Sequence, residues 1–503
     1  AALLRCKLMH AGTSDTSRIR SHGRVPAGLQ TPPMGYSSWN DCASEITEER
    51  IKNVTTALIN TGLAAKGARE LPLCDVHASN ELPCGRGGRN GLWWLVSAGF
   101  VHVNVDEGWL KNRSAAGTIL EDRVKFPSGM KALGDWIHDQ VVPGKGKIMK
   151  YGLYTCRGTC QCSTQLYQGP GSHGHVKEDA QWLADAGADY LKEDSVRSLK
   201  HVHQHAVRFS HVFVAQCCGS QDHQTAFADY AEMRDALNGT GRPVYFSLCG
   251  WNTWYAPEGD RLGNSWRIAG DGTNWGALSI CMNKNSQLQQ YARPGAWNDP
   301  DLLQGTGKGS NDKRTNPSGC YDPATMRQTK DWYQSITQAK AQFSFWSLMS
   351  APLLIAADPG QVEPELIEIW GNTELIAVSQ SFRAGGPYQG GRIAGGDLSY
   401  DIKAKKGSGT NVWGKLLPDG AFALGFVSNE DTPTDVTCDA ACFANITASG
   451  GTTELAPAAY SVRDLWLHQD LPEVKPPFSF SAKALPPHGG SAVFKFTPHH
   501  NGA

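Results

Sequence analysis

The sequence has almost no net charge and few charged residues for its length. Lys and Arg number 47 against 48 Asp and Glu in 503 residues, which gives a formal net charge of −1, and charged residues make up 19%. That share is below the quarter found in an average protein. A chain this balanced has no broad basic surface, so neither nucleic acid nor anionic lipid is expected as a partner. Its ligands must be recognised by local sites.

Long apolar runs and zinc-binding cysteine patterns are missing as well. The longest apolar stretch, 343–357, contains Pro352 and three serines. It is too short to cross a bilayer, so no membrane partner is expected. None of the paired CxxC or C₂H₂ spacings typical of structural zinc sites occurs.

What is present favours a large folded enzyme. Hydrophobic residues make up 40% of the chain, enough for a sizeable core, which excludes a disordered or collagen-like protein. Glycine (55) and tryptophan (16) are abundant. This combination favours a loop-rich protein that stacks flat aromatic side chains on its ligand.

Cysteines and glycosylation signals indicate the compartment. Fourteen cysteines are many for a cytosolic enzyme, and four N-x-S/T sequons begin at Asn53, Asn112, Asn238 and Asn445. Together they predict disulfides and N-glycans, and therefore a secreted or lysosome/vacuole-type location. Because residues 1–12 lack the apolar core of a signal peptide, such a peptide is expected to have been removed or to be missing from the sequence.

Short β-like runs alternate with helical stretches from about Leu29 to about Ser379. Strands are expected within 34–40, 101–109, 151–155, 189–195, 244–251, 264–271 and 296–303. Repeated β-then-α order indicates parallel strands with helical crossovers. Seven or eight such units predict an α/β fold of the (β/α)₈ TIM-barrel type rather than an open sheet.

The texture of the chain changes after Gly385. Glycine-rich turns now separate short alternating runs, which predicts an antiparallel β-domain to the C-terminus. The expected division is a polar tail over 1–27, a barrel domain over 28–385 and a β-domain over 386–503.

Charged and polar side chains cluster where the expected strands end. They are Asp106, Glu107, Lys192, Asp194, Arg267, Asp271, Asn298, Asp299 and Asp301. In a barrel these ends meet on one face. Because a Lys and an Arg stand among the carboxylates, a polyol pocket is favoured over a metal site. Paired carboxylates beside aromatic platforms are what glycosidic bond cleavage requires; the candidate platforms are Trp39, Trp109, Trp251 and Trp297.

Several motifs resemble glycoside hydrolase family 27, the family of α-galactosidases (melibiases) and α-N-acetylgalactosaminidases. They are TPPMGYSSWN, FPSGMKALGDWIHD, PGSHGHVKEDAQWLADAGADYLKEDS, MRDALNGTGRPVYFSLCGW, SWRIAGD, WNDPDLL and FSFWSLMSAPLLIAAD, in the family's order from residue 31 to 358. The resemblance implies a (β/α)₈ barrel followed by a β-sandwich. It also implies a retaining exo-glycosidase that removes terminal α-D-galactosyl groups from carbohydrates by double displacement, with no metal or organic cofactor.

The resemblance assigns roles to individual residues. Asp194 matches the family's nucleophile and Asp271 its general acid/base, while Lys192 and Arg267 match residues that bind sugar hydroxyls. The other expected substrate-binding residues are Trp39, Asp106, Glu107, Tyr154, Gly250 and Trp251.

Two departures from the family keep other substrates open. Glu107 replaces the usual Asp and extends toward the space of the galactose CH₂OH group, which favours a β-L-arabinopyranoside. Gly250 replaces a Glu that reads the sugar 2-hydroxyl, which makes room for the 2-acetamido group of an α-N-acetylgalactosaminide. A carbohydrate-binding protein without catalysis is the non-enzyme alternative, and the presence of both Asp194 and Asp271 counts against it.

A third departure concerns the disulfides. Val196 and Gly108 stand where the family usually has cysteines, so four cysteines must pair differently or stay free: Cys42, Cys156, Cys160 and Cys162.

Two segments, about 68–90 and 197–223, look inserted relative to the family. We expect them to form loops near the barrel rim, because loops tolerate insertions. The hypothesis for Cys42 is a disulfide to Cys74 or Cys84 in the first of them.

Overall fold

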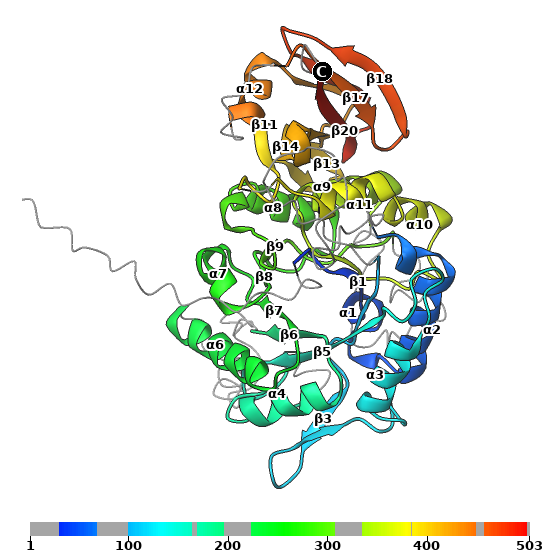
Figure 1. Cartoon of the computed structure of the whole chain (residues 1–503), viewed down its shortest axis with the longest axis vertical. Coiled ribbons are helices and arrows are strands. Elements are labelled where there is room, and N and C mark those ends of the chain that lie inside the picture. Colours follow the sequence, from blue (N-terminus) through cyan, green and yellow to red (C-terminus); the bar gives the residue numbers. More distant parts are fainter. Residues whose placement is uncertain are drawn as a thin grey trace, which may run out of the picture.

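The computed structural model describes residues 30–67, 99–162, 169–195, 223–306, 334–383, 385–448 and 457–499. A β-rich body lies on top of an α/β body along the longest axis (Figure 1). The expected tail, the first insertion and nearly all of the second lie outside the described residues. Among the described helices, none combines the length and apolarity needed to cross a bilayer.

Eight parallel strands form the α/β body, in the order β10-β1-β2-β5-β6-β7-β8-β9. They are β1 (Met34–Ser37), β2 (His102–Asn104), β5 (Lys150–Cys156), β6 (Tyr190–Asp194), β7 (Tyr245–Cys249), β8 (Ser265–Arg267), β9 (Trp297–Asp299) and β10 (Leu353–Ile355). A parallel bridge between Leu303 and Ile355 joins the two ends of the sheet. The predicted barrel and its seven predicted strands are confirmed.

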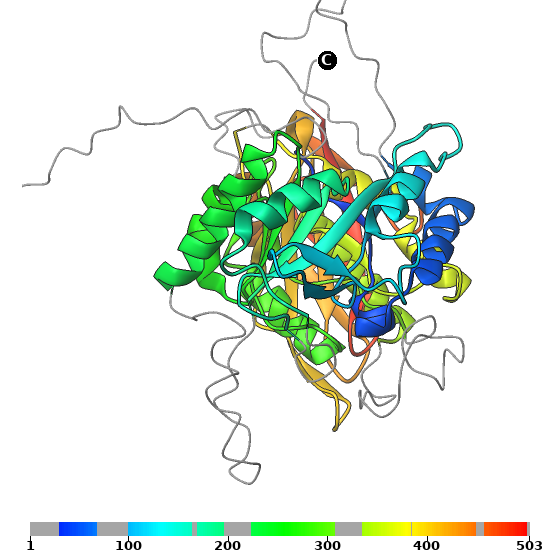
Figure 2. The same cartoon turned by 90° about the horizontal axis from the view of Figure 1, so that it is seen from below.

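Helices lie around these strands (Figure 2). They are α1 (Trp39–Cys42), α2 (Glu48–Asn60), α3 (Met130–Asp139), α4 (Val176–Asp185), α6 (His223–Gly239), α7 (Ala256–Leu262), α8 (Trp275–Asn285), α9 (Ile336–Leu348), α10 (Pro364–Trp370) and α11 (Thr373–Gln380). Local sequence fixes where several begin. Ser335 and Gln338 form a reciprocal capping box at α9, which satisfies two backbone N–H groups that the helix leaves unpaired.

A β-sandwich follows. Its main sheet has the order β11-β14-β15-β20-β17-β18 and is antiparallel throughout. The strands are β11 (Gly391–Gly395), β14 (Thr410–Leu416), β15 (Phe422–Ser428), β17 (Ala459–Asp464), β18 (Gln469–Val474) and β20 (Gly490–His499). A second antiparallel pair, β16 (Thr434–Cys438) and β19 (Phe480–Leu485), packs over it. The predicted antiparallel β-domain is confirmed.

Strand β15 shows how the main sheet serves two cores. Phe422, Leu424 and Phe426 belong to the apolar cluster inside the sandwich. Ala423 and Val427 belong instead to the cluster of the barrel. Successive side chains of a strand point to opposite faces, so one face of the sheet closes the sandwich and the other covers the barrel helices.

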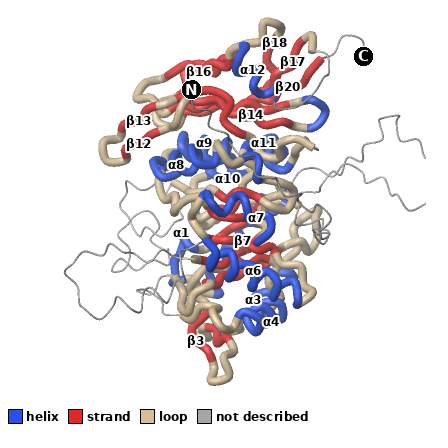
Figure 3. The backbone as a smooth tube through the Cα atoms, turned by 90° about the vertical axis from the view of Figure 1, so that its left-hand side faces the viewer, coloured by secondary structure: helices blue, strands red, loops and turns tan. Residues whose placement is uncertain are grey.

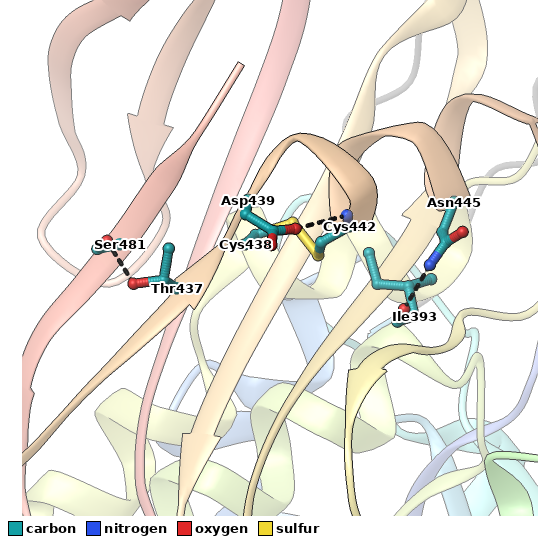
Figure 4. Close-up of a disulfide and its surroundings, with 7 residues drawn as sticks. All are labelled: Ile393, Thr437, Cys438, Asp439, Cys442, Asn445 and Ser481. Carbon is teal, nitrogen blue, oxygen red and sulfur yellow. Dashed lines mark hydrogen bonds between the residues drawn. A yellow bond between two sulfur atoms is a disulfide. The ribbon is translucent and has the colours of Figure 1, made fainter. Parts of the chain in front are cut away.

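Two hairpins and one helix remain among the described strands and α-helices. The hairpin of β3 (Leu110–Arg113) and β4 (Ile119–Glu121) projects from the barrel (Figure 1). A second hairpin joins β12 (Ser399–Asp401) and β13 (Lys406–Ser408). Helix α12 (Ala440–Ala448) is tied to β16 by the Cys438–Cys442 disulfide, and the Asp439 carboxylate accepts the Cys442 N–H at 3.0 Å (Figure 4).

A buried lysine joins the sandwich to the barrel. Helices α9 and α11 lie beneath the main sheet (Figure 3), and Lys415 of β14 points at the end of α11. Its Nζ donates to Ser350 Oγ at 2.6 Å, to the carbonyl of Ser379 at 3.2 Å and to that of Val378. Burial lowers the pKa of Lys415 well below its usual value. The Lys415 side chain thus donates hydrogen bonds to backbone carbonyls that the end of a helix leaves unpaired.

Lys415→Ala is therefore expected to weaken the whole structure. It removes the donor to two buried carbonyls and leaves a cavity, together worth about 2–4 kcal/mol of unfolding free energy. Urea unfolding followed by tryptophan fluorescence measures the change. Lys403→Ala, at an exposed position of the same domain, is the control and is expected to stay within about 0.5 kcal/mol of the parent. Equal stability of the two variants would contradict a stabilising role of Lys415 between the sandwich and the barrel.

Candidate active site

The predicted nucleophile closes strand β6. Asp194 is 4% exposed, and each of its carboxylate oxygens accepts a hydrogen bond. The Tyr154 hydroxyl of neighbouring β5 donates to Oδ2 at 3.1 Å, and the backbone N–H of Ser195 donates to Oδ1 at 2.7 Å. These contacts fix the plane of the carboxylate.

Lys192 lies on the same face of β6 as Asp194, as its spacing of two residues requires. Its Nζ forms a 2.8 Å ion pair with Asp106 Oδ2 and lies 5.2 Å from the centre of the Tyr154 ring. Burial disfavours the ammonium, but the surrounding carboxylates, Asp106 foremost, outweigh it and hold the pKa of Lys192 well above its usual value. The site therefore carries a fixed positive charge beside the nucleophile.

Glu107 follows Asp106 after the end of β2 and is 1% exposed. Its backbone N–H donates to Asp106 Oδ1 at 2.9 Å, and its Oε2 lies 3.5 Å from the Tyr154 hydroxyl oxygen. Tyr154 thus lies between Glu107 and Asp194. The structure brings these five predicted residues together: Asp106, Glu107, Tyr154, Lys192 and Asp194.

The predicted acid/base lies in a second group around Arg267. Arg267 ends β8, and one guanidinium nitrogen contacts both Asp271 Oδ1 at 3.1 Å and Asp301 Oδ2 at 2.9 Å. The Asp271 side chain is 47% exposed, whereas Asp301 is buried. A half-exposed carboxyl can exchange protons with solvent and with a leaving group, as an acid/base must.

Asp301 is a residue of this site to which the sequence analysis gave no role. Its Oδ2 accepts the backbone N–H of Gly272 at 2.5 Å, which fixes the peptide that follows Asp271. Burial, opposed by Arg267 and reinforced by Asp271, raises the pKa of Asp301 to about 6. Its presence among the strand-end polar residues was the available signal. Its backbone φ of 113°, which turns the side chain toward Arg267, could not be read from sequence.

Gly250 follows β7, and its surroundings differ from the expectation. A Cβ at this position would collide with the ring of Tyr255, a residue that is 1% exposed. The missing side chain is thus replaced by an aromatic ring from η5 (Thr253–Tyr255). The volume beside Gly250 is therefore occupied by the Tyr255 ring, contrary to the open space expected from sequence.

The prediction of an aromatic platform is wrong for two of the four tryptophans. Trp109 and Trp297 are completely buried; Trp109 stacks on Trp182 at 5.2 Å, and Trp297 packs against Phe382. Both are core residues.

The other two platforms remain candidates. Trp39 on α1 and Trp251 after β7 are half-buried. Trp251 has φ 60° and donates from its indole nitrogen to Cys249 Sγ at 3.1 Å. A non-glycine residue with positive φ is uncommon and marks a constrained loop.

A cavity of about 20 Å³, room for about one water molecule, lies among the strand ends. Its lining includes six residues named above: Asp106, Tyr154, Lys192, Cys249, Arg267 and Asp299. Both Lys192 and Arg267 line this cavity, so it lies between the residues around Lys192 and those around Arg267. Asp194, Asp271, Gly250, Trp39 and Trp251 are not among its lining residues.

The cysteines follow both courses that the sequence left open. Cys42 and Cys160 are disulfide-bonded, while Cys156 and Cys162 are free thiols, as are Cys249 and Cys281. The candidate partners of Cys42, Cys74 and Cys84, lie outside the described residues, so that pairing stays a prediction.

Gly108 accounts for one missing cysteine. It has φ 124°, and a Cβ there would collide with the carbonyl of Ser44. Any side chain would force that backbone apart, so glycine suits this turn. In the part of the chain that the structure describes, no three His, Cys, Asp or Glu side chains gather as a metal site would require.

Comparison with known proteins identifies both bodies. Residues 93–316 match the family model described as alpha galactosidase A, and residues 407–496 match the alpha galactosidase C-terminal beta sandwich domain. Alpha-galactosidase 3 of Arabidopsis thaliana is 30% identical over 457 residues, which cover 88% of this chain and 77% of the relative. The alpha-galactosidase of Cyamopsis tetragonoloba is 29% identical over 446 residues, 87% of this chain and 80% of the relative.

Solved structures share the fold. Alpha-galactosidase I of Mortierella vinacea superposes with a TM-score of 0.67 at 22% identity, covering 95% of this chain and 100% of that one. A β-L-arabinopyranosidase of Geobacillus stearothermophilus gives a TM-score of 0.63 at 17% identity, with 94% and 98% coverage. With matched families over both bodies and a relative at 30% identity across most of its length, this chain belongs to the α-galactosidase (melibiase) family, glycoside hydrolase family 27.

Proposed function

We propose that the protein is a retaining α-galactosidase that removes terminal α-D-galactosyl groups from oligosaccharides, polysaccharides or glycoconjugates. The observation that carries the proposal is a pair of carboxylates, one at the end of β6 and one after β8, two strands of the same barrel sheet separated by β7. Asp194 is buried and held by two donors, while Asp271 is half-exposed and paired with Arg267. The relatives at about 30% identity are α-galactosidases.

In the first step, an Asp194 oxygen attacks the anomeric carbon and the bond to the leaving oxygen breaks. Tyr154 and the Ser195 N–H orient the carboxylate before attack, so little reorganisation is needed. Asp271 supplies a proton to the leaving oxygen. The product of this step is a galactosyl ester of Asp194.

In the second step, Asp271 acts as a base. Having lost its proton, it takes one from a water molecule, and the resulting hydroxide displaces Asp194 from the sugar. Two inversions give net retention of configuration. The Arg267 guanidinium, 3.1 Å from Asp271, holds the Asp271 side chain in place for this step.

The residues around Lys192 offer hydrogen-bond donors and acceptors for the sugar hydroxyls. Lys192 and Asp106 offer a charged donor and acceptor 2.8 Å apart, an arrangement suited to a polyol. The remaining proposed contacts are Trp39, Glu107, Tyr154, Gly250, Trp251 and Arg267. The ring of Tyr255 against Gly250 supports a 2-hydroxyl rather than a bulkier 2-acetamido group.

Initial rates on three p-nitrophenyl glycosides test the substrate. We expect α-D-galactoside to give the highest kcat/KM, above β-L-arabinopyranoside and α-N-acetylgalactosaminide. Glu107→Asp, which withdraws the carboxylate by one methylene, should shift the ratio of galactoside to arabinopyranoside further toward galactoside. A parent enzyme that prefers either of the other two glycosides would overturn the substrate assignment, and one inactive on all three would favour a binding protein.

We also propose passage through the secretory pathway. The disulfide between Cys438 and Cys442 and the disulfide-bonded Cys42 and Cys160 support an oxidising compartment. The asparagines of the four sequons, Asn53, Asn112, Asn238 and Asn445, are all exposed, as glycan attachment in the folded protein requires.

A further inference from the structure

One buried arginine contacts the end of the strand that carries Asp194. Arg157 follows β5 directly, and its side chain is 1% exposed. Its backbone N–H donates to the carbonyl of Asp194 at 3.1 Å, and its Nε donates to Ser195 Oγ at 2.7 Å. Arg157 therefore contacts Asp194 through its backbone and Ser195, the residue after β6, through its side chain.

Ser195 connects Arg157 to the Asp194 carboxylate. Its backbone N–H donates to Asp194 Oδ1 at 2.7 Å, so its position fixes the direction of that hydrogen bond. The other carboxylate oxygen accepts from Tyr154. Both oxygens of the nucleophile are thus controlled from β5 and the residue after it: one directly by Tyr154, and one by Arg157 through Ser195.

The other end of the guanidinium is anchored in the helix layer. One terminal nitrogen forms a 2.5 Å ion pair with Asp229 of α6, and the group lies 5.8 Å from the centre of the Tyr230 ring. The Tyr230 hydroxyl in turn donates to the carbonyl of Glu193 at 3.4 Å. Because a guanidinium is planar with donors in a fixed fork, it holds β6 and α6 at a defined spacing.

We propose that Arg157 is a positioning residue for the nucleophile: it holds Ser195, and through it the Asp194 carboxylate, in line for attack on the anomeric carbon. This inference rests on the proposed function, because it takes Asp194 as the nucleophile. A small misplacement of a reacting group can slow a reaction by about 10²-fold. The effect falls on covalent bond formation and not on binding of the sugar.

Arg157→Gln tests the proposal, since glutamine keeps a donor but loses the charge and the fork. The probe is 5-fluoro-α-D-galactosyl fluoride, from which the nucleophile displaces fluoride to leave a slowly hydrolysed ester. We expect the rate constant of labelling to fall about 10- to 100-fold, while the inhibition constant of galactose stays within about twofold. Peptide mass spectrometry identifies the labelled residue in parent and variant.

Arg113→Gln is the matched control. The Arg113 side chain is 10% exposed and makes two hydrogen bonds of 2.6 Å to Asp179 of α4, but it contacts neither Asp194 nor Ser195 in any described interaction. It should lose stability comparably and keep its labelling rate. Ser195→Ala, which cuts the link and leaves the Asp229 ion pair, should slow labelling as well, and it stands in if Arg157→Gln fails to fold.

The outcomes separate this inference from the proposed function. Normal labelling of Asp194 in Arg157→Gln, or in Ser195→Ala if the first variant does not fold, overturns the positioning role and leaves Asp194 as the nucleophile. Equal slowing in Arg157→Gln and Arg113→Gln also overturns it, because the effect would then follow stability. A label found on a residue other than Asp194 in the parent protein defeats the nucleophile assignment itself.

Discussion

Asp194→Asn is expected to leave a folded protein whose turnover of α-galactosides is reduced by on the order of 10⁴- to 10⁶-fold, as when other enzymes lose a covalent nucleophile. Asparagine fills the same volume, and its amide oxygen can still accept one of the two hydrogen bonds, from Tyr154 or from the Ser195 N–H. It cannot form the galactosyl ester. The measurement is kcat on p-nitrophenyl α-D-galactoside, with the unfolding midpoint as a check on folding.

Azide sharpens this test. Asp194→Ala removes the carboxylate and leaves space for a small anion, so azide should attack the α-galactoside directly in this variant and give β-galactosyl azide by a single inversion. Glu193→Gln is the matched control, because Glu193 is the adjacent carboxyl on the opposite face of β6. Burial raises the pKa of Glu193 well above its usual value, so glutamine mimics its neutral form. Near-parental turnover in Asp194→Asn, or its loss in Glu193→Gln, would contradict the assignment.

Asp271→Asn should produce a different pattern. Loss of general acid/base catalysis is worth about 10²- to 10⁴-fold, and the loss should depend on the leaving group. Natural galactosides, whose alkoxide leaves poorly without a proton, should be affected most. A dinitrophenyl galactoside should form the Asp194 ester almost normally and then stall. Pre-steady-state release of dinitrophenol measures the two phases.

Azide again distinguishes the mechanism. In Asp271→Asn it attacks the accumulated ester without needing a base, so it should restore turnover and give α-galactosyl azide with net retention. Sodium chloride at equal ionic strength is the control for salt effects. Opposite anomers from the Asp194 and Asp271 variants would establish double displacement. The same anomer from both, or an equal loss on every leaving group, would sink the assigned roles.

Much of the fold could be predicted because its signals are local and periodic. The seven predicted strands lie where short apolar runs end in polar residues. Strand β10 (Leu353–Ile355) was not predicted as a separate strand, because it lies within the apolar stretch 343–357 that also contains the end of α9. A continuous apolar run has no period with which to separate a buried helix from a buried strand. In the sandwich, β18 has the polar sequence QDLPEV, which lacks the alternation that reveals a strand.

The location of the site could be predicted from sequence, but the orientation of its side chains could not. Strand-end carboxylates could be found from sequence because a barrel gathers those ends on one face. Which way a side chain turns after the strand depends on backbone angles that sequence does not reveal. Trp109 follows Gly108, at φ 124°, and turns into the core, whereas Asp301, at φ 113°, turns toward Arg267. Arg157 was missed because its partners Ser195 and Asp229 lie far from it in sequence.

The packing of Tyr255 against Gly250 has a consequence for the protein's history. A glutamate cannot be restored at position 250 by one substitution, because the aromatic ring already occupies the volume of its Cβ. The ring would first have to shrink, which would open a cavity beside β7 in a folded intermediate costing about 3–5 kcal/mol. Each single substitution is therefore expected to destabilise the protein, and the effects of changing both residues are expected to be non-additive. We therefore expect recognition of the sugar 2-position to change more easily by substitutions elsewhere in the site than by placing a glutamate at position 250.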